Sequence, residues 1–299
     1  KFLNEAVQDK TCVVVGTRPG IIKMSPLIQE LSNRTCESFV IHAGQHYSKK
    51  LDADIFDDLG LDYPDHHLEG VEDTEFHGEQ TAVMLQGIEE VLLKETPENV
   101  LVCGDANFNL AGALAARKLC LKVGHVEAGL RSGDWRMPEE HNRVMIDHIS
   151  DYLFAPTEQA KLNALEDNVK GSIHVTGNTI VDAVERNIEI SREKSTVIDD
   201  LGLADFALFT AHREENVDDP EILANLIEVI RRLANTYDVE VVYPIHPRTK
   251  KRLRQFDLEE KVEALNALLI TEPVRYLDFL RLFDEAKIVL TDSGGVQEE

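Results

Sequence analysis

Short apolar runs alternate with amphipathic helical patterns along almost the whole chain of 299 residues. Such alternation predicts successive βαβ units, whose parallel strands are covered by helices on both faces. The apolar runs predict strands at 12–15, 38–41, 100–103, 123–126, 152–155, 206–209, 239–243, 267–270 and 288–290. The amphipathic patterns predict helices at 21–31, 79–94, 110–119, 140–150, 182–192, 220–234 and 275–283. The chain is therefore expected to be of the α/β class.

The length of the chain predicts two domains, because it exceeds that of most single domains. A second set of strands begins after Gly177, so we expect two Rossmann-like domains at residues 1–177 and 178–299. The polar segment 193–200 is interpreted as a surface excursion near their junction. The segment 291–299 stops at the start of a helix just after a strand, so the second domain is expected to be incomplete at its C-terminus.

The charge balance argues against two classes of partner. The sequence holds 55 acidic and 31 basic residues, for a formal net charge of −24. Such a surface repels nucleic acid and anionic lipid, so we expect neither nucleic acid nor membrane as a partner. The four cysteines have no C-x-x-C spacing and mostly occur in apolar runs. They are interpreted as reduced core residues of a cytoplasmic protein.

The segment from His125 to Arg143 is the most informative loop of the chain. It follows an apolar strand and ends where Pro138 and the two acids after it open a helix. A loop at the carboxyl end of a strand is where α/β sheets place their chemistry. This one carries four carboxylates, three arginines and a tryptophan that we expect to be exposed, which favours a functional loop over a merely solvated one.

Two strand-end loops are typical of phosphate binding. The loop 16–20 lies before a helix, and Arg18 and Lys23 add positive charge to its backbone N–H groups. Ser293-Gly294-Gly295 lies between a strand and a helix, where two glycines allow close approach of a phosphate. Neither loop matches the dinucleotide or ATP-hydrolysing patterns. A nucleotide diphosphate in the cleft between the domains would fit both loops.

Three more polar segments follow predicted strands, at Gly104-Asp105, at 210–216 and at 245–248. Histidines 125 and 212 with Glu127 could form a metal site, but no pair has the helical spacing of zinc ligands, so no metal is expected. A serine hydrolase is disfavoured because the chain has no G-x-S-x-G turn.

Taken together, these segments resemble the non-hydrolysing UDP-N-acetylglucosamine 2-epimerases. The resemblance runs in order through nearly the whole chain, by the segments Gly16-Thr-Arg-Pro, Gly44-Gln45-His46, Gly104-Asp105, His125-Val-Glu-Ala-Gly-Leu-Arg131, Pro138-Glu-Glu-x-Asn-Arg143, Gly177-Asn-Thr, His212-Arg-Glu-Glu-Asn216 and Asp292-Ser-Gly-Gly-Val-Gln-Glu-Glu299. It implies a glycosyltransferase-B-like fold of two Rossmann-like domains, with the nucleotide sugar in the interdomain cleft. It also implies a homodimer and a reaction without cofactor.

The family reaction has two half-steps. UDP is eliminated across C1 and C2 of UDP-N-acetylglucosamine, and 2-acetamidoglucal remains bound. UDP then adds back while a proton reaches the other face of C2, which gives UDP-N-acetylmannosamine. Such chemistry needs acid–base groups on two faces of the sugar and cations near the departing diphosphate. The product would serve cell-surface polysaccharide biosynthesis.

The resemblance assigns roles residue by residue. Acid–base catalysis falls to Asp105, Glu127, Glu139 and His212, and which carboxylate removes the C2 proton stays open. Substrate binding falls to Arg18, Lys23, Arg143, Arg213, Asn216, Ser293, Gly294, Gly295 and Glu299, of which Glu299 would hold the ribose. Some bacterial members bind a second UDP-N-acetylglucosamine as activator, and Gln45, His46 and His246 are the candidate residues for that site.

The chain departs from the family pattern at three positions. Gly20 replaces a glutamate in the first loop, Ala106 replaces the threonine after Gly-Asp, and Ser48 stands where activated members often carry glutamine. The changes at Gly20 and Ala106 keep a nucleotide-sugar sensor open as an alternative. Three further alternatives stay open: a 2-epimerase of a related UDP-diacetamido sugar, a glycosyltransferase and a hydrolysing epimerase.

Overall fold

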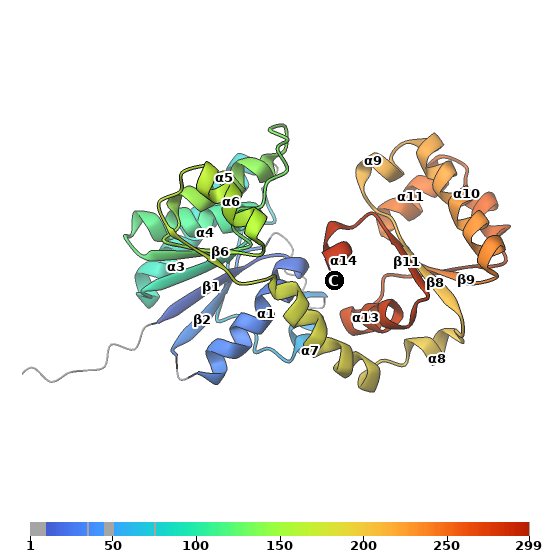
Figure 1. Cartoon of the computed structure of the whole chain (residues 1–299), viewed down its shortest axis with the longest axis horizontal. Helices are drawn as coiled ribbons and strands as arrows, with labels where there is room; N and C mark the ends of the chain where they lie inside the picture. The colour runs from blue at the N-terminus through green and yellow to red at the C-terminus, as the bar shows by residue number, and fades with distance from the viewer. Residues whose placement is uncertain (1–9, 35, 45–50, 75, 299) are drawn as a thin grey trace, which may run out of the picture. The chain divides into compact units, whose positions relative to one another are not determined.

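The computed structural model describes residues 10–34, 36–44, 51–74 and 76–298, with the side chains of 51–53 left out. The chain divides into two compact units, one ending at Ala183 and one beginning at Val184. The division falls inside the helix α7 (Thr179–Lys194), whereas the sequence placed the change of domain just before this helix. The units are described one at a time (Figure 1).

The first unit is built on a parallel sheet with the strand order β3-β2-β1-β4-β5-β6-β7. This is the order of a doubly wound fold, in which the connections reverse direction between β1 and β4. Its strands are β1 (Thr11–Val15), β2 (Ser38–His42), β3 (His66–His67), β4 (Asn99–Cys103), β5 (Lys122–Val126), β6 (Tyr152–Ala155) and β7 (Ser172–Val175). All five predicted strands are confirmed. Strands β3 and β7 were missed, because β3 has two residues and β7 is largely exposed at the sheet edge.

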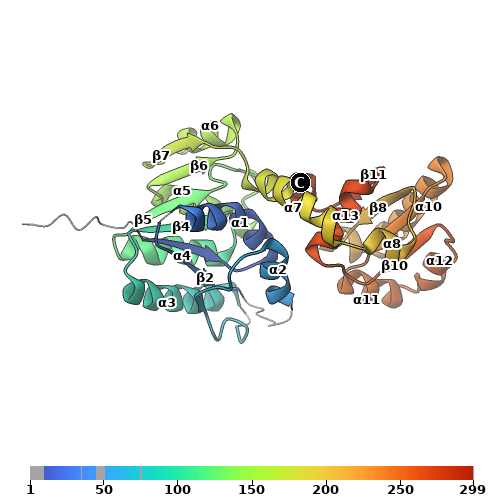
Figure 2. The same cartoon turned by 90° about the horizontal axis from the view of Figure 1, so that it is seen from below.

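Helices cover both faces of this sheet (Figure 1, Figure 2). Helix α4 packs between α3 and α5 on one face, and α1 packs beside α2 on the other. Besides α7, the helices are α1 (Arg18–Asn33), α2 (Leu51–Leu59), α3 (His77–Glu95), α4 (Asn107–Lys118), α5 (Pro138–Ile149) and α6 (Glu158–Glu166). The double cover explains why β1 is apolar without alternation: Cys12 and Val14 pack toward α4, and every residue of the strand is buried.

The second unit repeats the plan with a four-stranded parallel sheet in the order β10-β9-β8-β11. Its strands are β8 (Phe206–Thr210), β9 (Glu240–Pro244), β10 (Leu268–Thr271) and β11 (Ile288–Thr291). Its helices are α8 (Val197–Leu201), α9 (Glu214–Val217), α10 (Pro220–Tyr237), α11 (Pro247–Gln255), α12 (Glu259–Glu263), α13 (Tyr276–Glu285) and α14 (Gly294–Glu298). Phe209 and Tyr243 point into a core with α10, whereas Phe206 and Leu208 point into a core with α8 and α13. The predicted fold class, α/β with two Rossmann-like domains, is confirmed.

Two smaller expectations hold only in part. The segment 193–200 is mostly exposed, as expected, but it is largely helical: its start completes α7, and Val197, which is 8% exposed, begins α8. Its apolar residues lie among polar ones, which hid their helical spacing. Among the cysteines, Cys12 and Cys103 are buried but Cys36 and Cys120 are exposed.

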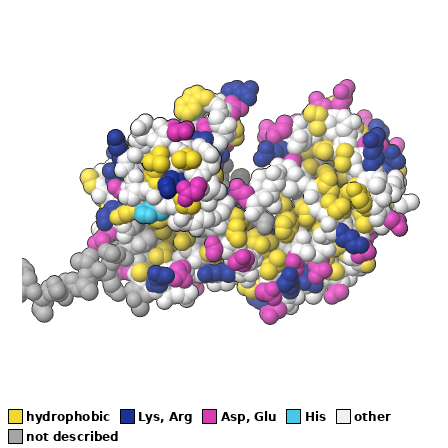
Figure 3. All heavy atoms as spheres, viewed as in Figure 1, with side chains coloured by type: hydrophobic (Ala, Val, Ile, Leu, Met, Phe, Trp, Pro, Cys, Tyr) yellow, Lys and Arg dark blue, Asp and Glu magenta, His cyan; other side chains and the backbone are white. Residues whose placement is uncertain are grey.

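The surface carries charge of both signs. Acidic and basic side chains are dispersed over the visible face rather than gathered into one field (Figure 3). None of the described helices has both the length and the apolar character of a membrane span.

Close packing after β5 leaves no room for a side chain at Gly129. Its φ is +79°, and an added Cβ would lie 2.1 Å from the backbone oxygen of Ala160 at the start of α6. Gly60 also has a positive φ, of +63°, but nothing lies within 4 Å of its Cβ position. We therefore expect Gly60→Ala to lower the free energy of unfolding by about 1–2 kcal/mol, through backbone strain alone. Gly129→Ala should lower it by more than about 3 kcal/mol, because α6 must also move. Urea unfolding of the two variants measures the difference, and equal losses would contradict it.

Candidate active site

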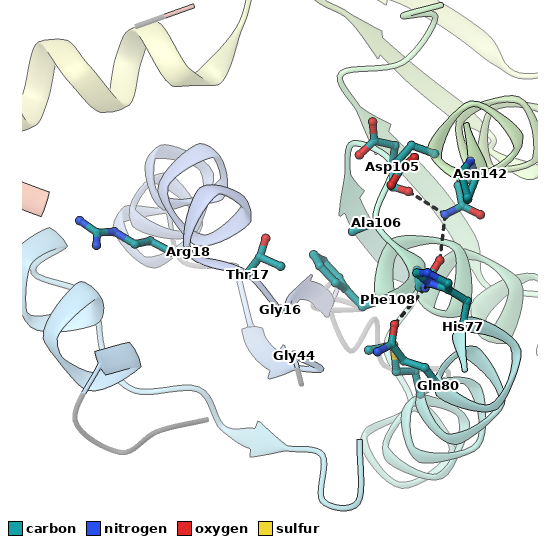
Figure 4. Close-up of a pocket in the computed structure, with 14 residues that line it drawn as sticks. Gly16, Thr17, Arg18, Gly44, His77, Gln80, Asp105, Ala106, Phe108 and Asn142 are labelled. Atoms are coloured by element: carbon teal, nitrogen blue, oxygen red, sulfur yellow. Dashed lines mark hydrogen bonds between the residues drawn. The ribbon is translucent and has the colours of Figure 1, made fainter. Parts of the chain in front are cut away.

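The carboxyl ends of β1, β4 and β5 meet at one edge of the first sheet, as they must in neighbouring parallel strands. A cavity of about 370 Å³ opens at this edge (Figure 4). It is lined by Gly16, Thr17, Arg18, Gly44, His77, Gln80, Met84, Asp105, Ala106, Asn107, Phe108, Pro138, Glu139 and Asn142. Of the predicted site residues, the cavity brings together Arg18, Asp105 and Glu139.

Arg18 and Glu139 stand at the starts of two helices that border the cavity. The Thr17 side chain caps α1 by accepting a hydrogen bond from Gly20 N at 3.3 Å, and Arg18 is the first helical residue. The guanidinium of Arg18 points away from Asp105 and Asn142 (Figure 4). Glu139 lies in the first turn of α5, and within the described part of the chain its carboxylate makes no hydrogen bond or ion pair. It therefore remains available for a ligand.

Asp105 is held from α5 at two points. Arg143 Nη2 lies 2.5 Å from Asp105 Oδ2, and Asn142 Nδ2 donates to the backbone oxygen of Asp105 at 2.7 Å. Asn142 also donates to Asn107 Oδ1 at 3.1 Å. The side chain of Asp105 is 32% exposed and lines the cavity, so its position is fixed while it stays accessible.

Glu127 lies directly after β5 in an unusual backbone conformation, with φ at +65°. The other described non-glycine residues with positive φ follow the ends of helices, where this conformation is ordinary. Glu127 follows a strand instead, and strain of this kind gathers at functional sites.

Glu127 is 7% exposed, and its carboxylate has two polar neighbours. Lys23 Nζ lies 2.6 Å from Oε1, and Cys103 Sγ lies 3.8 Å from Oε2. Burial, with the charge of Glu127, raises the pKa of the Cys103 thiol, which keeps it a donor. Lys23 was expected to bind the diphosphate. In the structure it pairs with the carboxylate of Glu127, a candidate acid–base group.

His125 belongs to a buried network rather than to the accessible site. Both its side chain and that of Asp147 are fully buried, with Nδ1 2.6 Å from Asp147 Oδ1 and Nε2 3.0 Å from the backbone oxygen of Gly104. Asp147 Oδ2 accepts from Gly129 N at 3.0 Å and from Arg131 Nη2 at 2.6 Å. Burial raises the pKa of Asp147, but His125 and Arg131 outweigh it and hold that pKa below its usual value. No cluster of His, Cys, Asp or Glu able to hold a metal is found among the described residues.

Breaking this network should cost stability. Asp147→Asn removes the buried carboxylate that His125 Nδ1, Gly129 N and Arg131 Nη2 contact, although Arg131 keeps its pair with Asp167. Removing one partner of a buried ion pair typically costs about 3–5 kcal/mol of unfolding free energy. Because the pKa of Asp147 is depressed on folding, its contribution is present above the usual aspartate pKa and is lost as the pH falls. Asp134→Asn, which breaks an exposed pair with Arg136, should change stability little. Urea unfolding at pH 7 compares the two variants, and equal losses would contradict the argument.

Each of the three arginines in the segment 125–143 pairs with a carboxylate, and only the Arg136 pair lies within the loop itself. Arg131 pairs with Asp147, Arg136 with Asp134, and Arg143 with Asp105. Trp135 is 66% exposed, as expected, and its ring lies 4.5 Å from that of His141. The sequence missed Glu140: it is 3% exposed and accepts hydrogen bonds from Ser132 N, Gly133 N and Arg143 Nη1.

In the second unit, Asp292 organises the strand-end loops after β8 and β11. Its carboxylate accepts from the backbone N of His212 and of Arg213 at 3.0 Å, and from Asn216 Nδ2 at 3.0 Å. His212 Nδ1 lies 3.3 Å from Asp292 Oδ1, while its side chain stays 45% exposed. Burial raises the pKa of Asp292, but these donors outweigh it and lower that pKa. Asp292 occurs in the matched motif, yet no role was predicted for it.

The predicted phosphate loop of this unit lies beside an arginine. The Cβ position of Gly294 is 3.5 Å from Arg213 Nη2, so the guanidinium borders the glycine turn. Ser293 N donates to Thr291 Oγ1 at 2.9 Å, which fixes the start of the turn. Gly295 has only Ser293 Oγ near its Cβ position, at 3.8 Å. Arg213, Ser293, Gly294 and Gly295 are therefore brought together.

The residues expected at an activator site are only partly described. His246 caps α11, its Nδ1 accepting from Arg248 N at 3.2 Å, and its ring lies 6.0 Å from that of His212. Burial, with the charges of His212 and Arg248, lowers the pKa of His246. Gln45, His46 and Ser48, together with Glu299 at the expected ribose site, lie outside the described residues.

Comparison with known proteins identifies the family. The family model described as UDP-N-acetylglucosamine 2-epimerase matches residues 29–299. The UDP-N-acetylglucosamine 2-epimerase of Methanocaldococcus jannaschii is 50% identical over 97% of this chain and 80% of its own length. The UDP-2,3-diacetamido-2,3-dideoxy-D-glucuronate 2-epimerase of Pseudomonas aeruginosa is 38% identical over 97% of the chain and 80% of its own length.

A solved structure agrees with these sequence matches. The crystal structure of the M. jannaschii UDP-GlcNAc 2-epimerase in complex with UDP-GlcNAc and UDP matches with a TM-score of 0.84 and 49% identity. The match covers 96% of this chain and 80% of the other. This chain belongs to the UDP-N-acetylglucosamine 2-epimerase family.

Proposed function

We propose that this chain interconverts UDP-N-acetylglucosamine and UDP-N-acetylmannosamine. The observation that carries the proposal is a cavity with accessible carboxylates in a chain 50% identical to a UDP-N-acetylglucosamine 2-epimerase. Asp105 and Glu139 line the cavity, and Glu127 follows the strand next to that of Asp105. Several carboxylates at one sheet edge suit a reaction that needs proton transfer on two faces of a sugar.

The reaction balances as an elimination followed by an addition. A carboxylate takes the proton from C2, the C2–H electrons form the C1=C2 double bond, and the C1–O bond breaks toward UDP. UDP then adds to C1 of 2-acetamidoglucal while an acid protonates C2 from the opposite face. No electron is gained or lost overall, so the scheme needs no oxidant or reductant. We assign the acid–base roles to Asp105, Glu127, Glu139 and His212.

The diphosphate is assigned to cations and backbone donors. Arg18 at the start of α1 and Arg213 beside the 293–295 turn offer positive charge where the charge of UDP grows. Ser293, Gly294 and Gly295 would allow the close approach, and Asn216, Lys23 and Glu299 keep their predicted binding roles. A nucleotide sugar shared by both units, a homodimer, a cytoplasmic location and an activator site with Gln45, His46 and His246 also stay predictions.

A second substrate merits testing because of one relative. The P. aeruginosa relative named for a diacetamido-glucuronate substrate is 38% identical to this chain. The M. jannaschii relative named for UDP-N-acetylglucosamine is 50% identical, which favours the neutral sugar.

Proton NMR in D₂O tests the proposal directly. The protein is incubated with UDP-N-acetylglucosamine, and the C2 and anomeric signals are followed. Loss of the C2 proton signal with appearance of UDP-N-acetylmannosamine is the expected result. Absence of both, while the UDP-diacetamido-uronate reacts, would transfer the assignment to that substrate. Binding without exchange of either sugar would identify a sensor instead.

A further inference from the structure

Glu140 is a buried charged residue that the proposed reaction does not use. It lies in the first turn of α5 and is 3% exposed, next to Glu139, which lines the cavity. An ionised carboxylate is costly to bury unless hydrogen bonds replace its water. Three donors do so here: Ser132 N at 3.0 Å, Gly133 N at 3.1 Å and Arg143 Nη1 at 2.7 Å.

These donors keep Glu140 charged. Burial raises the pKa of Glu140, but the Ser132 and Gly133 backbone and the Arg143 side chain outweigh it and lower that pKa to about 2. The carboxylate is therefore ionised at neutral pH and acts as a fixed anchor. It ties the loop after β5 to the helix that begins at Pro138.

Arg143 links Glu140 to Asp105, because it contacts both carboxylates. The Arg143 side chain is 18% exposed, and its two terminal nitrogens contact different carboxylates, Nη1 that of Glu140 and Nη2 that of Asp105. Because the guanidinium is planar and rigid, fixing Nη1 on Glu140 also fixes the direction of Nη2. Glu140 and Arg143 are three residues apart on α5, so they share one face of the helix.

We propose that Glu140 is a positioning residue for the reaction, which orients Arg143 so that the carboxylate of Asp105 is held in place for proton transfer. The inference rests on the proposed function, because it gives Asp105 an acid–base role. It also makes Arg143 a partner of Asp105 within the protein, in addition to its predicted role at the substrate. Neither residue need touch the sugar for this action.

The test begins with Glu140→Gln, which removes the charge and keeps the shape. We expect kcat to fall roughly 10- to 100-fold, the loss that a misplacement of about 1 Å of a reacting group produces. KM should change far less than kcat, because no residue assigned to the substrate is replaced. The matched control is Glu158→Gln, which removes an exposed first-turn glutamate of α6 that pairs with Lys161 at the same spacing. The control should keep wild-type kcat and KM.

A double-mutant cycle separates positioning from a merely structural role. Arg143→Lys keeps the charge but loses the two-pronged guanidinium, so the link from Glu140 to Asp105 is broken. Glu140→Gln should then lower kcat far less in the Arg143→Lys background than in the wild type. If the kcat losses of the two single variants multiply in full in the double variant, Glu140 does not act through Arg143 and the proposal fails. A wild-type kcat in Glu140→Gln would equally overturn the proposal.

Two further measurements keep the outcomes distinct. If Glu140→Gln fails to fold, judged by circular dichroism, Glu140→Asp replaces it, since the shorter carboxylate keeps the charge but cannot reach all three donors. Glu140→Asp should lower kcat at unchanged KM, and a wild-type kcat would overturn the proposal. If the wild-type protein itself does not epimerise UDP-N-acetylglucosamine, the proposed function fails before any variant is compared.

Discussion

Asp105→Asn should lower the rate of epimerisation by roughly 10²- to 10⁴-fold, the range that general acid–base catalysis supplies. Asparagine has the same shape, and its side-chain oxygen can still accept a hydrogen bond from Arg143, so the loop should keep its conformation. The amide cannot accept a proton at neutral pH, and the chemical step is lost. Proton NMR of the variant in D₂O measures both epimerisation and exchange at C2.

The control for this variant is Asp134→Asn. Asp134 is also a loop carboxylate paired with an arginine, Arg136, but it is not among the residues that line the cavity. The control should retain wild-type turnover. Wild-type turnover in Asp105→Asn, with the control equally active, would remove Asp105 from the acid–base residues.

The place of Asp105 and Glu127 could be predicted because it depends on local pattern and on parallel pairing alone. Each follows an apolar run that reads as a strand, and strands β4 and β5 pair in register, Cys103 with Val126. Their ends therefore meet at one edge of the sheet. The same reasoning located Ser293–Gly295 and His212 at neighbouring strand ends of the second unit, after β11 and β8.

The partners of these residues could not be predicted from local pattern. Lys23 reaches Glu127 across 104 positions of sequence, and Arg143 reaches Asp105 across 38. Such pairs depend on where a helix packs and on how its side chains are turned, and neither is encoded by spacing along the chain. Lys23 was assigned to the substrate because a cation near a glycine loop suits an anion equally well. Arg143 was assigned there by the family resemblance alone.

Glu140 escaped notice for a different reason. Acidic residues after a helix-opening proline are ordinary, because the helix dipole favours them there. Glu139 and Glu140 fit that pattern equally, and only the structure distinguishes the half-buried Glu139 from the buried Glu140. Burial, which periodicity predicts poorly at the first turn of a helix, is what gives Glu140 its role.

Glu127→Gln should also lower epimerisation by roughly 10²- to 10⁴-fold, but its pattern of hydrogen exchange should differ from that of Asp105→Asn. If the two carboxylates act on opposite faces of C2, each variant keeps one working face. A variant that keeps the base for UDP-N-acetylglucosamine can still remove its C2 proton and return deuterium to the same face. It then exchanges this substrate without forming UDP-N-acetylmannosamine.

The other variant should exchange UDP-N-acetylmannosamine alone. Incubating each variant with each nucleotide sugar in D₂O therefore identifies which carboxylate removes the C2 proton from UDP-N-acetylglucosamine, the question that the sequence left open. Opposite patterns are expected. The same pattern in both variants would mean that Asp105 and Glu127 serve one face. The opposite face would then fall to Glu139, whose carboxylate lines the cavity, or to His212.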